Sequence, residues 1–206
     1  MLDSKGFDLW SDDYDKTVTL SEEADEYPFA GYKTVLNEIY KTIRSANGKT
    51  VLDIGFGTAI LTHRLYTDGY EIYGIDFSEK MLLTAKLKMP NATLIKHDFS
   101  NGLPGELQTK TFDFIICTYA LHHLTNPQKI AFINDLLPRL TPKGKLLIGD
   151  IAFETQSQLE DCAAKAGNEW DDEEIYSVAE QLRTAFPNLQ FKKISFCAGI
   201  FTFENR

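Results

Sequence analysis

The fold is decided by the stretch VLDIGFGTAI, residues 51–60 of the 206-residue chain. An apolar run from Thr50 to Ile54 breaks at two glycines, Gly55 and Gly57, and a helical pattern begins after them. Because glycine carries no side chain, the backbone of such a turn can approach a ligand closely. A strand, a glycine turn and a helix in this order are typical of a nucleotide site in an α/β sheet.

A second acidic residue strengthens the prediction of a nucleotide site. Asp76 follows the second predicted strand, 23 residues after Asp53, where a carboxylate can accept hydrogen bonds from both hydroxyls of a ribose. The dinucleotide fingerprint GxGxxG would require glycine at position 60, which is Ile60. Asp53 would face a pyrophosphate unfavourably, whereas it can help to organise the ammonium group of an amino acid. The pattern therefore opposes a nicotinamide-dependent oxidoreductase and favours S-adenosylmethionine.

The apolar pattern alternates between periods of two and 3.6, which predicts successive strands and helices. We expect an α/β fold: a doubly wound, Rossmann-like, mostly parallel sheet of seven strands with helices on both faces. The short link at residues 197–199 makes the last strand antiparallel, since a parallel crossover needs a dozen or more residues. Helices are predicted at 32–45, from the glycine turn to 65, at 78–88, from 127 onward and within 156–186. The predicted strands are residues 50–54, 70–75, 92–96, 112–117, 145–151, 190–196 and 199–204.

The composition limits the classes of partner. With 21 basic and 30 acidic residues the net charge is −9, which argues against nucleic acid and favours a small-molecule acceptor. The sequence contains no apolar run of the roughly 18–20 residues that a membrane helix needs. Its N-terminal segment lacks the features of a secretory signal, so a cytoplasmic protein is expected.

In combination, these motifs resemble the class I S-adenosylmethionine-dependent methyltransferase superfamily, and most closely its small bacterial YrrT-like members. The match runs from Phe7 to about Ile151. In that family the turn usually reads [D/E]xGxGxG, and here Ala59 stands in place of the third glycine. The resemblance implies a single methyltransferase domain over residues 1–206. Its parts would be an N-terminal flap and helix (1–47), a cofactor-binding core (48–151), and a helical insertion with the terminal strands (152–206).

The resemblance also implies which residues bind S-adenosylmethionine. The methionine portion would contact Asp53 and the turn, Asp76 would hold the ribose, and the aromatic ring of Tyr14 would close over the cofactor. Asp98 would recognise the adenine amino group, although aspartate at such a position also commonly caps a turn. The full set of predicted cofactor-binding residues is Tyr14, Asp53, Gly55, Phe56, Gly57, Thr58, Asp76, Phe77, Met81, Asp98, Phe99 and Thr118.

The stretch CTYALHHL, residues 117–124, follows the fourth strand, and open α/β sheets bind ligands at the carboxyl ends of their strands. Three residues in it are candidate general bases: Tyr119, His122 and His123. An imidazole can remove a proton from an acceptor near neutral pH. The alternative is that one histidine only hydrogen-bonds the backbone at a helix start.

No metal site is predicted, because the four histidines lack HExxH spacing and the three cysteines lack ligand pairs. The expected function is methyl transfer by in-line displacement to a small-molecule acceptor, with S-adenosylhomocysteine as product. A non-catalytic S-adenosylmethionine-binding regulatory module is the main alternative. These motifs encode neither the acceptor nor the oligomeric state.

Overall fold

The computed structural model describes residues 26–204, and one sheet runs through most of that range. Its strands follow the order β3-β2-β1-β4-β5-β8-β7, and a short strand, β6, pairs with the end of β5. The bounds are β1 Thr50–Ile54, β2 Glu71–Asp76, β3 Thr93–Lys96, β4 Phe112–Thr118, β5 Leu140–Phe153, β6 Ser177–Val178, β7 Gln190–Lys193 and β8 Ala198–Glu204. The α-helices are α2 Tyr32–Ser45, α3 Ile60–Thr67, α4 Glu79–Lys88, α5 Asn126–Leu136, α6 Gln156–Ala166 and α7 Ala179–Ala185.

Strand directions confirm the predicted topology. Strands β1 to β5 pair in parallel with one another, and β8 is antiparallel to both of its neighbours, β5 and β7. The order reverses at β1, which lies between β2 and β4. Such a switch point opens a crevice at the carboxyl ends of the central strands, where open α/β sheets hold their ligands.

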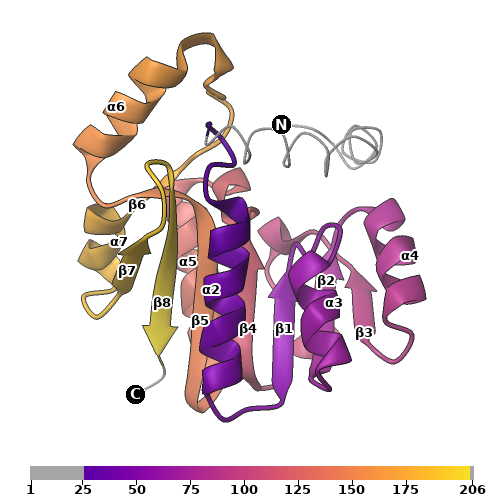
Figure 1. The fold of residues 1–206 in the computed structure, drawn as a ribbon. Helices are drawn as coiled ribbons and strands as arrows, with labels where there is room; N and C mark the ends of the chain where they lie inside the picture. Colours follow the sequence, from indigo (N-terminus) through magenta and orange to yellow (C-terminus); the bar gives the residue numbers. More distant parts are fainter. Residues whose placement is uncertain (1–25, 205–206) are drawn as a thin grey trace.

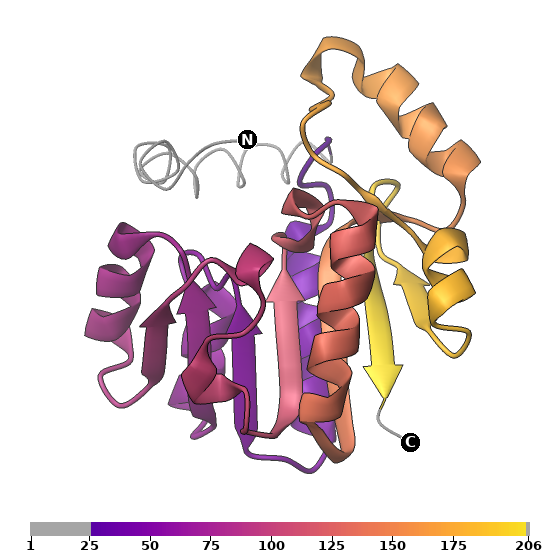
Figure 2. The same cartoon turned by 180° about the vertical axis from the view of Figure 1, so that it is seen from behind.

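Helices cover both faces of the sheet, as the sequence predicts. Figure 1 shows α2 and α3 in front of the central strands, and Figure 2 shows α5 on the opposite face. Neighbouring strand residues enter different cores: Val51 packs with the α2 side, and Leu52 packs with the α5 side. The two-residue period of a strand explains this division, and burial on both faces explains why the strands are continuous apolar runs.

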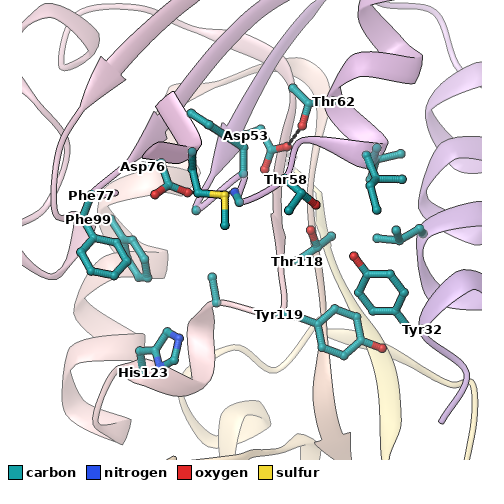
Figure 3. Close-up of a pocket in the computed structure, with 18 residues that line it drawn as sticks. Tyr32, Asp53, Thr58, Thr62, Asp76, Phe77, Phe99, Thr118, Tyr119 and His123 are labelled. Carbon is teal, nitrogen blue, oxygen red and sulfur yellow. Dashed lines mark hydrogen bonds between the residues drawn. The ribbon is translucent and has the colours of Figure 1, made fainter. Parts of the chain in front are cut away.

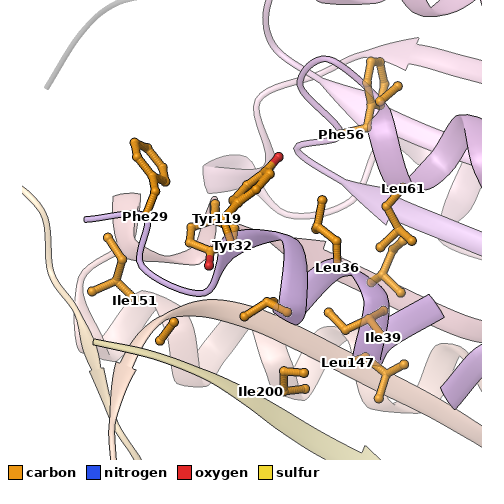
Figure 4. Close-up of a cluster of buried hydrophobic side chains, with 14 of the residues drawn as sticks. Phe29, Tyr32, Leu36, Ile39, Phe56, Leu61, Tyr119, Leu147, Ile151 and Ile200 are labelled. Carbon is orange, nitrogen blue, oxygen red and sulfur yellow. The ribbon is translucent and has the colours of Figure 1, made fainter. Parts of the chain in front are cut away.

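Helix α2 lies close against β5 (Figure 4). A Cβ atom on Gly149 of β5 would be 2.4 Å from Cγ1 of Val35 and 2.9 Å from Cδ1 of Ile39, both on α2. Glycine at this position therefore allows the helix to approach the strand. The helix ends where the sequence predicts, at Ser45, just before the Asn47-Gly48 pair.

Two strand predictions need correction. The Pro142-Lys143-Gly144 turn does not precede the strand but lies inside β5, as an irregularity of its pairing with β4. Lys143 takes a left-handed φ of 72° there, and the strand continues beyond it. Strand β7 ends at Lys193 rather than at 196. The hydroxyl of Ser195 accepts from Ala198 N at 3.0 Å and donates to Ala30 O at 2.7 Å, so the segment turns there instead of extending.

The segment between β5 and β7 carries α6, which projects from the end of the sheet above the other helices in Figure 1. Cys162 is the one residue of α6 that is buried. Strand β6 follows this helix and was not predicted, because two residues carry no readable periodicity. Among residues 26–204, no helix combines the length and apolar character needed to cross a membrane.

Candidate functional site

A cleft lies at the carboxyl ends of β1, β2 and β4, the place that the topology indicates (Figure 3). It holds about 670 Å³ of space, part of it open to solvent. Most of the predicted site residues line it: Asp53, Gly55, Phe56, Gly57, Thr58, Asp76, Phe77, Met81, Phe99, Thr118, Tyr119 and His123. Residues that sequence reasoning did not select also line it: Tyr32, Leu36, Ile60, Leu61, Thr62 and Ala120.

The glycine turn forms one wall of the cleft. Gly55 and Gly57 have φ values of 66° and 51°, in the left-handed region that favours glycine. The Gly55 amide donates to Ile75 O at 2.8 Å, and a Cβ atom on Gly55 would lie 2.8 Å from that of Ala120. A Cβ on Gly57 would meet nothing within 4 Å among the described residues, so the Gly57 backbone borders open space. The turn therefore leaves room for a ligand beside its main chain.

Asp76 is fixed at the end of β2 by backbone donors. Its Oδ2 accepts from Gly57 N and its Oδ1 accepts from Ser78 N, both at 2.8 Å. Ser78 is the N-cap of α4, as predicted, and its hydroxyl accepts from Met81 N at 3.2 Å. A carboxylate oxygen can accept more than one hydrogen bond, so hydroxyl donors of a ligand are suitable partners for this group.

Asp53 is a buried carboxylate with an unsatisfied oxygen. Asp53 is only 1% exposed, and its Oδ2 accepts a hydrogen bond from the Thr62 hydroxyl. Within the described part of the chain, Oδ1 has no hydrogen-bond partner. Burial raises the pKa of Asp53 to about 7. The hydrogen bond from Thr62 lowers this pKa, and the nearby charge of Asp76 raises it further. A cation placed beside Oδ1 would relieve the cost of burying this carboxylate.

Aromatic residues border the cleft on opposite sides (Figure 3). Phe77 and Phe99 lie on one side, and Tyr119 and Tyr32 lie on the other, with 4.8 Å between the two tyrosine ring centroids. Tyr119 has a left-handed φ of 51°, which is unusual for a bulky residue, and its amide donates to Gly149 O at 2.8 Å. Strained backbone of this kind is concentrated at functional sites.

One predicted cofactor residue among residues 26–204, Asp98, does not line the cleft. Asp98 is exposed, and its Oδ1 accepts from Ser100 N at 2.9 Å at the start of a short 3-10 helix. This contact is the turn cap that the sequence allowed as the alternative, and the adenine contact of Asp98 stays a prediction. Tyr14 lies outside the described residues.

The two adjacent histidines have different surroundings. They belong to the short 3-10 helix Leu121–His123 (η3) after β4, and their ring centroids are 4.3 Å apart. His123 lines the cleft, whereas His122 is buried and contacts Asp150 of β5. Burial, together with the proximity of His122, lowers the pKa of His123 to about 4.

His122 lies between two carboxyl groups. Its Nδ1 is 2.6 Å from Asp150 Oδ1, its amide donates to Asp150 Oδ2 at 3.1 Å, and its Nε2 is 3.4 Å from Glu174 Oε1. Burial alone would lower the pKa of His122, but the charges of Asp150 and Glu174 raise it above its usual value. Sequence reasoning missed both acids, because a single aspartate in an apolar strand and a glutamate in an acidic loop give no spacing signal.

Solved structures with the same fold include methyltransferases. The magnesium protoporphyrin IX methyltransferase ChlM of Synechocystis, solved with bound S-adenosylhomocysteine, superimposes with a TM-score of 0.67 at 20% identity. The superposition covers 86% of this chain and 85% of that one. The DhpI–S-adenosylhomocysteine complex gives a TM-score of 0.71 at 14% identity, covering 98% and 95% of the two chains. At these identities the likeness shows the fold alone.

Sequence relatives show the family. A model described as a methyltransferase domain matches residues 51–144. The chain is 35% identical over 193 residues to an uncharacterized methyltransferase of Oceanobacillus iheyensis, covering 90% of this chain and 87% of that protein. It is 30% identical over 199 residues to the uncharacterized methyltransferase YrrT of Halobacillus halophilus, covering 92% and 89%. The predicted resemblance is confirmed, and the chain belongs to the methyltransferase family that these relatives represent.

Proposed function

We propose that this methyltransferase transfers a methyl group from S-adenosylmethionine to a small-molecule acceptor by in-line displacement. The observation that carries the proposal is the pair of buried carboxylates on either side of the glycine turn. Asp53 offers an unsatisfied oxygen, and Asp76 offers two oxygens held by backbone amides. A ligand with an ammonium group at one end and a ribose diol nearby would satisfy both.

The remaining cleft residues fit the other parts of this cofactor. The open backbone at Gly57 and Thr58 would lie along the methionine portion, and Thr118 would lie near it from the end of β4. Phe77 and Phe99 both border one side of the cleft, where a flat adenine ring can pack (Figure 3). When bound, S-adenosylmethionine supplies an activated methyl group on a sulfonium, so positioning by the protein dominates the catalysis.

We place the acceptor at the part of the cleft bordered by Tyr119 and His123. Both residues line the cleft and follow β4, and the unusual backbone of Tyr119 directs its ring toward Tyr32. His123 and Tyr119 are the catalytic candidates that can reach an acceptor. His122 is buried behind them and is held by Asp150, so we assign it a positioning role.

The fold that surrounds the cleft serves methyltransferases that act on different compounds. Proteins with the same fold include a magnesium protoporphyrin IX methyltransferase, the N-methyltransferase NodS and an amino pentose methyltransferase. Such different acceptors on one fold show that the sheet does not determine acceptor choice. In this chain, the segment between β5 and β7 supplies Glu174 beside His122, and we propose that it contributes to that choice.

Titration calorimetry with S-adenosylmethionine and S-adenosylhomocysteine tests the proposal, with NAD as a competing ligand. We expect both adenosyl ligands to bind at micromolar concentration and Asp76→Ala to abolish binding. Asp135→Ala, which removes an exposed carboxylate on α5, is the matched control and should bind normally. Binding of NAD alone would overturn the proposal. Subsequent formation of S-adenosylhomocysteine with a panel of small acceptors would separate an enzyme from a binding module.

A further inference from the structure

Three potential metal ligands converge at the acceptor end of the cleft. They are His122, His123 and Glu174, and one ligand atom from each lies within 4.8 Å of the others. The histidines come from η3, which follows β4, and Glu174 comes from the segment that precedes β6. Because Glu174 comes 51 positions after His123, no short spacing motif in the sequence could indicate this cluster.

Hydrogen bonds hold the two segments together. The amide of Ile175 donates to His122 O at 2.9 Å. The carbonyl of the same residue accepts from Nζ of Lys129, a side chain that is fully buried under the cluster. Since Ile175 follows Glu174 directly, these contacts fix the glutamate beside η3. The cluster is therefore a product of the fold and not a chance approach of exposed side chains.

The ring of His122 is oriented as a metal ligand would be. In the neutral form of His122 that binds a metal ion, Nδ1–H donates to Asp150 Oδ1 at 2.6 Å, and Nε2, which faces Glu174, carries the lone pair for the ion. Asp150 itself is held by the amides of His122 and Ile151. A carboxylate on the far nitrogen of a histidine is the usual outer-shell partner of a metal-binding imidazole. Tyr176 orients the third ligand in the same way, since its hydroxyl donates to Glu174 Oε2 at 2.8 Å.

The distance between two of the ligands also matches a metal centre. Nε2 of His122 and Oε1 of Glu174 are 3.4 Å apart, longer than most nitrogen–oxygen hydrogen bonds. Two ligands at about 2.0–2.1 Å from a tetrahedral zinc ion are about 3.3 Å apart. The three ligand atoms lie within 4.8 Å of one another, so they would move closer together to bind one ion.

We propose that His122, His123 and Glu174 bind a divalent transition-metal ion, with zinc as the first candidate and Asp150 as the outer-shell partner of His122. Two imidazoles and one carboxylate form a ligand set that zinc uses in catalytic sites, where a fourth position stays open. His123 lines the cleft, so the open position would face the acceptor. This proposal replaces the expectation from sequence spacing that the chain has no metal site.

The role of the metal ion rests on the proposed methyl transfer. A hydroxyl or thiol of the acceptor would occupy the open position, and its proton would leave to solvent because a bound metal ion lowers the pKa of such a group. The oxygen or sulfur lone pair then forms a bond to the methyl carbon while the sulfonium–methyl bond breaks. The electron pair of the broken bond stays on the sulfur, which gives the methylated acceptor, S-adenosylhomocysteine and one proton.

Metal binding can be measured without the methyl-transfer reaction. Protein freed of metal by chelator and dialysis is titrated with Zn²⁺, and the bound metal is counted after gel filtration; Co²⁺ is then used for its visible absorption. We expect one ion per chain, and loss of that ion in Glu174→Gln and His123→Gln. The matched control is His63→Ala, which removes a histidine outside the cluster and should leave the binding unchanged. Asp150→Asn should weaken binding about 10–100-fold.

Each outcome has a defined meaning. Absence of stoichiometric Zn²⁺ and Co²⁺ binding, equal binding by Glu174→Gln, or a cobalt–thiolate absorption band from the cysteines would each overturn the metal proposal. Glu174 is partly exposed, so its variant should fold, and S-adenosylhomocysteine calorimetry on each variant checks that the cleft is intact. Metal binding without S-adenosylhomocysteine binding would instead overturn the proposed function and leave the metal site standing.

Discussion

At the residue scale, Asp53 shows how a ligand site can cost stability when it has no ligand. Its carboxyl group is buried at the end of β1, and one oxygen has no partner in the described part of the chain. An acid directly before the glycine turn could be predicted from the sequence. Thr62, which donates to it, could not, because a threonine inside a predicted helix carries no signal for a contact with a strand nine residues earlier.

The first prediction concerns the pH dependence of stability. The pKa of Asp53 is about 7 in the folded chain and about 3.9 in an unfolded one, so folding favours the protonated form. The stability that this group contributes is therefore present below pH 4 and lost as the pH rises through 7. In urea unfolding at pH 5 and pH 8, Asp53→Asn should be stabilised relative to wild type at pH 8 by on the order of 2–4 kcal/mol. An equal difference at both pH values would contradict the assignment.

The second prediction concerns cofactor affinity. Only the ionised form of Asp53 attracts an ammonium group, and with a pKa of about 7 its ionised fraction rises about tenfold between pH 6 and pH 8. Calorimetry should therefore show S-adenosylhomocysteine binding about tenfold more tightly at pH 8. Asp53→Asn should bind weakly at both pH values and lose the pH dependence. A wild-type affinity that does not change with pH would show that Asp53 does not face the ammonium group.

At the scale of elements, the bounds of helices and strands were predicted correctly where turn-forming residues mark their ends. Helix α2 and strand β1 were predicted with their observed bounds, because the Asn47-Gly48 pair and the glycine turn mark their ends clearly. The extent of β5 was not predicted, since a proline, a lysine and a glycine favour a turn, and only pairing with β4 on both sides of this irregularity joins the two parts into one strand. The break in β7 depends on Ser195 and Ala30, which are 165 residues apart. Local pattern cannot report such a contact.

The third prediction tests the packing of α2 on the sheet. In Gly149→Ala, the new methyl group would meet Val35 at 2.4 Å and Ile39 at 2.9 Å, and overpacking of this kind typically costs about 1–3 kcal/mol. Urea unfolding should show this loss in Gly149→Ala. Gly105→Ala is the control, since its Cβ would meet nothing within 4 Å among the described residues. Adding Val35→Ala should recover part of the loss in a double-mutant cycle, and strict additivity would show that the two residues do not clash.

At the scale of the whole molecule, the proposed site has two halves, one for the cofactor and one for the acceptor, with different origins in the sequence. The cofactor half is formed by a contiguous turn and an acid at the end of the next strand, so a sequence pattern could predict it. The acceptor half needs His122, Asp150 and Glu174 to meet, and they come from three distant segments. Only the fold brings them together, which is why the sequence suggested the histidines as bases and not as part of a cluster.

The last prediction concerns whether cofactor binding in one half depends on the residues of the other half. A ligand at 100 times its dissociation constant stabilises a protein by about 2.7 kcal/mol, which for a chain of this size raises Tm by about 5–10 °C. Thermal unfolding with S-adenosylhomocysteine should show this rise in wild type and in Glu174→Gln, but not in Asp76→Ala. Because Asp76 is held at the glycine turn and Glu174 contacts the histidine cluster, we expect only the first substitution to remove a cofactor contact. Loss of the rise in Glu174→Gln would mean that the acceptor half shapes the cofactor cleft, and the two would have to be treated as one cooperative site.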